Sequence, residues 1–157
     1  MIETIYHDLD GVHADIAKKT FELSGIPFSK ITSAQFWEAA NTCPEFFWEL
    51  ERLETSQALL DATSHVRCVV LTALPLRFNG EDQKRKWVKK HLGYLEVIVV
   101  PAKNKADYAT PNSILIDDTL RNINWWVSAG GIGIHHTSLE NTIELLKQHG
   151  AHRCLTL

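Results

Sequence analysis

Short apolar runs alternate with amphipathic stretches along the chain, which is typical of α/β proteins with a parallel sheet. Most of the apolar runs are rich in Val and Ile, as expected of strands that are covered on both faces. The pattern predicts five strands: Ile2–His7, Val66–Leu71, Leu95–Val100, Ser113–Ile116 and Ile132–His135. We therefore expect an α/β fold in which helices connect the strands of one parallel sheet.

Helices are predicted in the intervals between these runs, because their ends carry suitable capping residues. One helix is expected between Asn79, a candidate N-cap, and Gly93, which follows its last turn. A second is expected over 120–129, ahead of two glycines. Thr137 and Glu140 have the spacing of a capping box and predict a last helix near the C-terminus.

The interval between the first two strands is much longer than a plain crossover connection needs. Its first part, 14–24, is expected to be helical. Two capping boxes predict two further helices: Thr32 with Gln35, and Thr42 with Glu45. We therefore expect 14–64 to form a small helical cap inserted after the first strand, with 1–13 and 65–157 as the core.

Length and composition restrict the class of protein. The chain has 157 residues, which fits one domain with a small insertion. Its formal net charge of -3 argues against a dedicated surface for nucleic acids or anionic membranes, which is usually basic. We expect no signal peptide, no bilayer-spanning run and no membrane partner. Three cysteines without close spacing argue against a zinc or redox motif and favour a reducing, cytoplasmic location: Cys43, Cys68 and Cys154.

Acidic residues follow two of the predicted strands. Asp8 and Asp10 come directly after the first strand, and Asp117 and Asp118 follow the fourth. The carboxyl ends of parallel strands share one edge of a sheet, so the two pairs should converge on a site that suits Mg²⁺. Taken singly, the first pair also fits a polar turn, and the second fits acidic residues at a helix N-terminus.

Two further polar features stand near predicted strand ends. Thr72 and the backbone N–H of Ala73 are suited to phosphate oxygens, although a threonine at this place also fits a simple turn. Either Lys103 or Lys105, both of which precede the fourth strand, would neutralise a phosphate and a nearby carboxylate.

The order Asp-x-Asp, Thr, Lys, Asp-Asp resembles the haloacid dehalogenase superfamily of phosphohydrolases. The resemblance spans the whole core and implies a Rossmann-like parallel sheet. It also implies that Asp8 attacks phosphorus and forms a phosphoaspartate, while Asp10 acts as general acid and then as general base. Three residues would bind the phosphoryl group: Thr72, Ala73 and Lys105.

The same resemblance implies a magnesium cofactor. Four acidic residues would form its site, the second through its backbone carbonyl: Asp8, Asp10, Asp117 and Asp118. Lys105 is preferred over Lys103 as the phosphate lysine because it begins a Lys-Ala-x-Tyr-Ala pattern that resembles the superfamily. The chemistry agrees, because a cation and a lysine must offset the charge of a phosphate monoester before a carboxylate can approach it.

Within the superfamily, the chain is most similar to the 5'(3')-deoxyribonucleotidases and related small bacterial and phage proteins. Residues 8–15 resemble their extended first motif, 130–134 resemble their last strand, and Phe47 with Trp48 resembles a segment of their cap. The resemblance implies hydrolysis of a nucleoside monophosphate, with those two aromatic rings near the base. Three residues depart from the family pattern and leave the substrate open: His13, Ala73 and Thr119.

Two other functions also fit parts of the sequence. The segment 84–88 resembles a helix in the phosphatase domains of polynucleotide kinases, which would make a 3'-phosphorylated nucleic acid end the substrate. The net charge and the cap argue against it. A receiver-type signalling domain also uses acidic residues, a threonine and a lysine, but there the lysine comes last, whereas here it precedes the final acidic pair.

Overall fold

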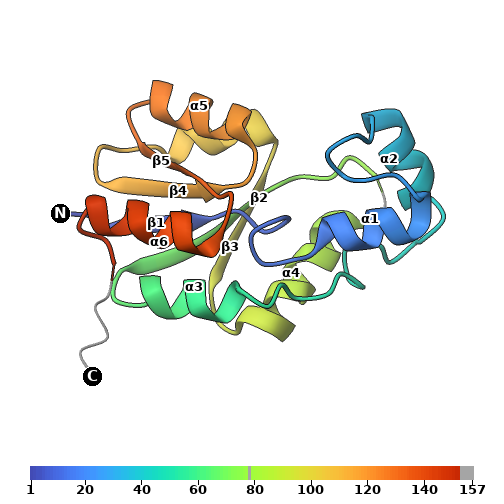
Figure 1. The fold of residues 1–157 in the computed structure, drawn as a ribbon, viewed down its shortest axis with the longest axis horizontal. Helices are drawn as coiled ribbons and strands as arrows, with labels where there is room; N and C mark the ends of the chain where they lie inside the picture. Colours follow the sequence, from blue (N-terminus) through green and yellow to red (C-terminus); the bar gives the residue numbers. More distant parts are fainter. Residues whose placement is uncertain (78, 153–157) are drawn as a thin grey trace.

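The computed structural model of the protein describes residues 1–77 and 79–152. In this part of the chain, five parallel strands form one sheet in the order β3-β2-β1-β4-β5 (Figure 1). The strands are β1 Thr4–His7, β2 Arg67–Ala73, β3 Glu96–Val100, β4 Ser113–Asp117 and β5 Ile132–His135. All five predicted strands and the parallel sheet are therefore confirmed. Cys154 lies outside the described residues.

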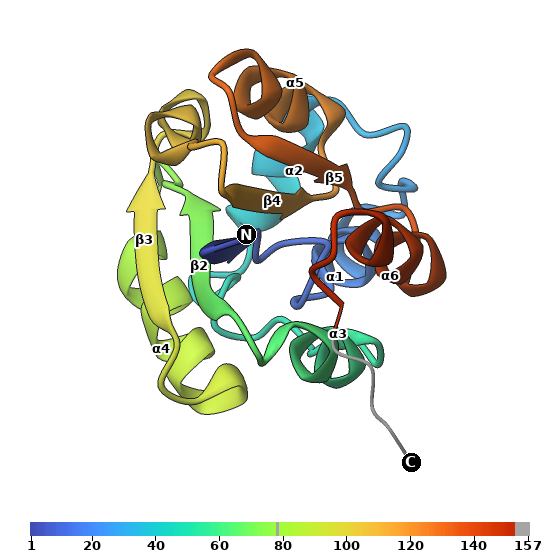
Figure 2. The same cartoon turned by 90° about the vertical axis from the view of Figure 1, so that its left-hand side faces the viewer.

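The helices follow the strands in the alternation that the sequence predicts. They are α1 Ile16–Ser24, α2 Ser33–Ala40, α3 Ser56–Thr63, α4 Gly80–Leu92, the 3₁₀ helix η1 Ala102–Tyr108, α5 Leu120–Ser128 and α6 Leu139–Gln148. In Figure 1, α5 lies above the sheet, α3 and α4 lie below it, and α1 with α2 projects to one side. The perpendicular view in Figure 2 shows β3 at one edge of the sheet with α4 beside it.

Both faces of the sheet are covered, which explains the continuous apolar runs in its strands. Tyr6 and Leu115 point to the face covered by α5, where they pack with the fully buried Trp126. Ile5 and Ile114 point to the opposite face and pack with residues of α3 and α6. Because these strands are parallel, the carboxyl ends of β1, β2 and β4 lie at the same edge of the sheet.

Two capping predictions are wrong. The predicted box at Thr42 does not start a helix, because its hydroxyl donates to the carbonyl of Ala39 at 2.6 Å at the end of α2, and turns follow over 44–49. The last helix is capped by Ser138 rather than Thr137, because the Ser138 hydroxyl accepts from the N–H of Asn141 at 3.1 Å. The capping box at Thr32 and Gln35 is confirmed.

The inserted segment begins and ends side by side. The N–H of Asp15 donates to the carbonyl of Glu51, and the N–H of Leu53 donates to the carbonyl of His13, each at 2.8 Å. Between these two paired segments of the chain, α1 and α2 pack on each other away from the sheet (Figure 1). Leu59 of α3, by contrast, packs with the sheet residues. The division of the chain at residues 14 and 64 stays a prediction.

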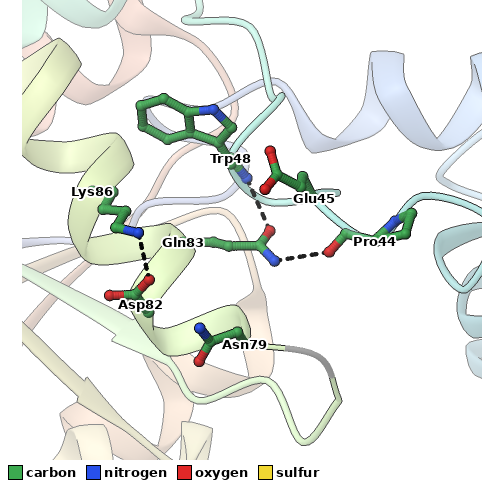
Figure 3. Close-up of a pocket in the computed structure, with 7 residues that line it drawn as sticks. All are labelled: Pro44, Glu45, Trp48, Asn79, Asp82, Gln83 and Lys86. Carbon is green, nitrogen blue, oxygen red and sulfur yellow. Dashed lines mark hydrogen bonds and ion pairs between the residues drawn. The ribbon is translucent and has the colours of Figure 1, made fainter.

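Helix α4 contacts the returning end of the inserted segment. Trp87 of this helix is fully buried and its indole N–H donates to the carbonyl of Leu50 at 2.7 Å. Figure 3 shows Gln83, one turn earlier, facing the turn segment that begins at Pro44. The helix therefore fixes the returning end of the insertion against the core. Among the described residues, no helix is long and apolar enough to cross a membrane.

Candidate active site

The predicted catalytic residues meet at the carboxyl edge of the sheet. Asp8 directly follows β1, Asp117 ends the neighbouring strand β4, and Lys105 lies in η1 after β3. The ammonium group of Lys105 donates to Oδ1 of Asp8 and to Oδ2 of Asp117, both at 2.8 Å. Lys105 is 2% exposed, whereas Lys103 is exposed on the surface. The structure thus brings Lys105, and not Lys103, to the acidic residues.

Burial and neighbouring charges shift the pKa values of the residues in this cluster. Burial and the Asp117 carboxylate raise the pKa of Asp8 well above its usual range, and Lys105 opposes this effect. Burial and the same carboxylate raise the pKa of Asp118 to about 6. Burial disfavours the charge of Lys105, but the carboxylates of Asp8 and Asp117 outweigh it and raise the pKa of the lysine. One lysine does not compensate all the carboxylates, so the cluster favours a further cation.

A divalent metal fits the acidic residues in this cluster. Asp8, Asp117 and Asp118 offer oxygen atoms that all lie within 4.8 Å of one another. Both oxygens of Asp117 already accept hydrogen bonds, Oδ1 from the N–H of Thr119 at 2.8 Å and Oδ2 from Lys105 and Asn122. The carboxylates of Asp8 and Asp118 are therefore best placed as ligands. Carboxylate oxygens are the ligands that Mg²⁺ prefers.

Gly11 permits the close approach of the loop after β1 to Asp118. Its φ is +84°, a conformation that favours glycine. A Cβ at this position would lie 2.0 Å from Oδ2 of Asp118. The absence of a side chain at residue 11 thus lets the two acidic segments stand together.

A second buried lysine enters the site from α4. Lys84 is 3% exposed, and its ammonium group lies 2.9 Å from Oδ2 of Asp10. The same group donates to Oγ1 of Thr72 at 3.0 Å and to the carbonyl of Ala73 at 2.8 Å. Through Lys84 the structure therefore joins Asp10 to Thr72 and Ala73, two of the three residues that were predicted to bind phosphate. Oδ1 of Asp10 is buried and has no hydrogen-bond partner in the described part of the chain.

A small pocket of about 140 Å³ opens onto these groups. Its lining includes the predicted residues Asp8, Asp10, Ala73, Lys105 and Asp118. Four further residues that line it were not predicted: Ile16, Phe28, Thr119 and Asn122. This volume suits a phosphoryl group but leaves little room for the leaving group of the substrate. A neighbouring cavity of about 450 Å³ shares Ile16, Phe28 and Asp118 with this pocket, so a larger leaving group has room beside Phe28.

The two predicted cap aromatics lie elsewhere. Phe47 is buried, and its ring faces the ammonium group of Lys84 at 4.9 Å from the ring centroid. Trp48 lines a separate cavity of about 610 Å³ against α4 (Figure 3). Gln83 holds the turn between these regions, because its side chain accepts from the N–H groups of Phe47 and Trp48 at 3.0 and 3.2 Å. Neither aromatic residue lines the pocket at Asp8.

The sequence did contain a signal for the unpredicted lysine. Trp87 and Val88 mark the buried face of α4, and Lys84 stands three and four residues before them on the same face. A basic run masked this position, because neighbouring lysines such as Lys86 are exposed. Asn122 similarly shares the buried face of α5 with Trp126. Phe28 lies in a loop, where periodicity gives no guidance.

A comparison with family models places the chain among known proteins. The model of the 5' nucleotidase, deoxy (pyrimidine), cytosolic type C protein (NT5C) matches residues 31–150, which is more than half of the chain. The chain belongs to this family. The nucleotidase match includes Thr72, Lys105 and the acidic pair at the end of β4, while Asp8 and Asp10 precede it. Membership confirms the prediction of a phosphatase of the nucleotidase type.

Solved structures confirm the haloacid dehalogenase fold of this nucleotidase. A hydrolase from Streptococcus pneumoniae TIGR4 has a TM-score of 0.62 and 16% identity, over 93% of this chain and 98% of that one. A HAD family hydrolase from Deinococcus radiodurans R1 with bound phosphate and sodium has a TM-score of 0.56 and 11% identity, over 96% and 89%.

A third solved structure also has this fold. It is the L-2-haloacid dehalogenase from Xanthobacter autotrophicus with chloropropionic acid covalently bound, with a TM-score of 0.55 and 11% identity, over 96% and 84%. At these identities the structures establish the fold alone. No curated protein matches the chain.

Proposed function

We propose that the protein is a magnesium-dependent phosphomonoesterase that hydrolyses nucleoside monophosphates through a phosphoaspartate on Asp8. The observation that carries the proposal is the position of Asp8, which is buried at the floor of the pocket and hydrogen bonded to Lys105. The family membership supports a nucleotide as the substrate. The family description as cytosolic also supports the cytoplasmic location expected from the sequence.

The reaction divides into two displacements at phosphorus. In the first, the carboxylate of Asp8 forms a bond to phosphorus while the bond to the leaving oxygen breaks, and Asp10 protonates that oxygen. In the second, water attacks the phosphoaspartate and Asp10 accepts its proton. Lys105 and the backbone around Thr72 bind the phosphoryl oxygens throughout, so that negative charge does not repel the nucleophile.

Mg²⁺ fits beside Asp8 and Asp118, with Asp117 holding Lys105 and the backbone in place. When bound, the metal supplies Lewis-acid stabilisation of the phosphoryl oxygens. The D. radiodurans hydrolase of the same fold contains phosphate and sodium, which is consistent with an anion and a cation side by side in such a pocket. The contribution of the Asp10 backbone carbonyl to the metal remains part of the proposal.

Recognition of the nucleoside is the least constrained step. Phe28 is the aromatic side chain among the residues that line the pocket, and it also borders the larger neighbouring cavity. Stacking of a base on an aromatic ring is worth about 1–3 kcal/mol. The predicted contact of Phe47 and Trp48 with the base stays a prediction. For this contact to form, the cap would have to change its position.

The proposal is tested by a phosphatase screen over nucleoside monophosphates and a 3'-phosphorylated oligonucleotide, with Mg²⁺ or with excess chelator. We expect mononucleotides to be hydrolysed in Mg²⁺ alone, and Asp8→Asn to be folded and inactive. Faster hydrolysis of the oligonucleotide would favour the polynucleotide phosphatase. The burial of Lys84, the first residue of the basic run, argues against that function, because a buried lysine is not available to a DNA strand.

A further inference from the structure

Lys84 is placed more rigidly than a charged surface residue. Its ammonium group has three N–H donors. These donors face three acceptors, namely Oδ2 of Asp10, Oγ1 of Thr72 and the carbonyl of Ala73, at distances between 2.8 and 3.0 Å. A buried ammonium group is costly unless it is paired and hydrogen bonded, so these three contacts hold the Lys84 ammonium group in its buried position.

The helix that carries Lys84 is itself fixed on both sides of the lysine. Gln83 accepts from the N–H of Phe47 and donates to the carbonyl of Pro44 at 2.9 Å (Figure 3). Trp87 donates to the carbonyl of Leu50, and it is fully buried. A lysine on such a helix has little freedom to follow a moving partner, so it can determine where that partner lies.

The two carboxylate oxygens of Asp10 have different surroundings. Oδ2 is held by Lys84, while Oδ1 is buried without a partner in the described residues and belongs to a side chain that lines the pocket. The Asp10 side chain as a whole is 18% exposed and lines the pocket, so its carboxyl group is within reach of a leaving group bound there.

We propose that Lys84 is a positioning residue for the proton transfer: it holds Oδ2 of Asp10 and so fixes where the carboxyl group of Asp10 meets the leaving oxygen. This inference rests on the proposed function, in which Asp10 is the general acid. In the first displacement, the bond between phosphorus and the leaving oxygen breaks and its electron pair stays on that oxygen. The proton of the Asp10 carboxyl group moves to it, while the bond from Asp8 to phosphorus forms.

The inference separates substrates by their need for that proton. A nucleoside leaves as a basic alkoxide and depends on protonation, whereas p-nitrophenolate is a stable anion and leaves without it. Loss of Lys84 should therefore slow the first displacement much more for a nucleoside monophosphate than for p-nitrophenyl phosphate. A lysine that only stabilised the fold, or only helped Thr72 to bind phosphate, would affect both substrates equally.

The experiment measures kcat/KM for both substrates on one preparation of Lys84→Met, because this quantity reports the first displacement and not the later hydrolysis of the phosphoaspartate, in which Asp10 also acts. Partial unfolding lowers both values by the same factor and leaves their ratio unchanged. General acid catalysis typically contributes about 10²–10⁴-fold, and a displacement of about 1 Å can remove about a hundredfold. We expect the ratio of the nucleotide rate to the aryl phosphate rate to fall about tenfold or more. Lys86→Met, two residues away on the exposed face of α4, should leave the ratio unchanged.

A double-mutant comparison identifies the partner through which Lys84 acts. In an Asp10→Asn background, adding Lys84→Met should leave the ratio unchanged, because the proton donor is already absent. An unchanged ratio in Lys84→Met alone would overturn the inference, and so would a fall of equal size with Asp10 present or replaced. The proposed function fails separately, if wild-type protein hydrolyses neither substrate or if Asp8→Asn retains activity.

Discussion

Gly11→Ala should damage the metal site by a route that can be followed from the backbone. Gly11 has a φ of +84°, where an L-residue costs about 1–2 kcal/mol of stability. The new Cβ would lie 2.0 Å from Oδ2 of Asp118, while such contacts shorter than 3.0 Å are essentially never observed. The carboxylate must therefore retreat by about 1 Å, the difference between these two distances. We expect Mg²⁺ affinity to fall about 10- to 100-fold, the range typical when a metal ligand loses its orientation.

Gly25→Ala is a matched control. Gly25 also has a positive φ, +71°, at the end of α1, but a Cβ there would meet nothing within 4 Å. Both variants should lose about 1–2 kcal/mol of unfolding free energy, measured in urea, because both place alanine in a left-handed conformation. Only Gly11→Ala should require more Mg²⁺ for half-maximal phosphatase activity.

The comparison can refute the assignment of Asp118. If Gly11→Ala is destabilised as expected but keeps the wild-type Mg²⁺ dependence, then the position of the Asp118 carboxylate does not control metal binding. Excess Mg²⁺ should restore most of the activity of Gly11→Ala, because the ligand is displaced rather than removed.

Two other predictions follow from contacts in the site. Lys105→Met should lower the phosphatase rate on the order of a hundredfold, because it removes a preorganised charge beside Asp8, whereas the exposed Lys103→Met should be close to wild type; a reversed order in steady-state assays would make the choice of lysine wrong. Phe28→Ala should raise KM for a nucleoside monophosphate about 5- to 150-fold, the equivalent of about 1–3 kcal/mol of stacking, with a smaller effect on an aryl phosphate. If Trp48→Ala shows that selective effect and Phe28→Ala does not, the base lies against the cap segment that the sequence indicated.

The strands and their order of appearance could be predicted because parallel strands covered on both faces are continuously apolar. The motif order at their ends then placed Asp8, Lys105 and Asp117 near one another, as the sheet requires. The helix starts were harder, because hydroxyl side chains serve more than one role. Thr42 closes the end of α2 instead of starting the next helix, and Ser138 takes the cap expected at Thr137.

Side chains that reach the site from helices or from the insertion were predicted less well. Lys84 shares a face with apolar residues, but its basic neighbours made it resemble a surface position. Trp48 was expected near the base because its segment resembles the nucleotidase cap, yet its N–H donates to the side chain of Gln83, which holds this segment against α4. These placements depend on contacts between residues far apart in the chain, which local patterns do not encode.

The most direct test of the central claim is to trap the covalent intermediate on Asp8. Asp10→Asn should accept the phosphoryl group from p-nitrophenyl phosphate, whose leaving group needs no proton, and should then hydrolyse the phosphoaspartate slowly for lack of a base. Rapid quenching and borohydride reduction would convert the trapped residue to homoserine, which mass spectrometry locates within the peptide. The account predicts a burst of nitrophenolate and homoserine at position 8. Homoserine at another acidic residue, or steady phosphate release without any trapped residue, would contradict it.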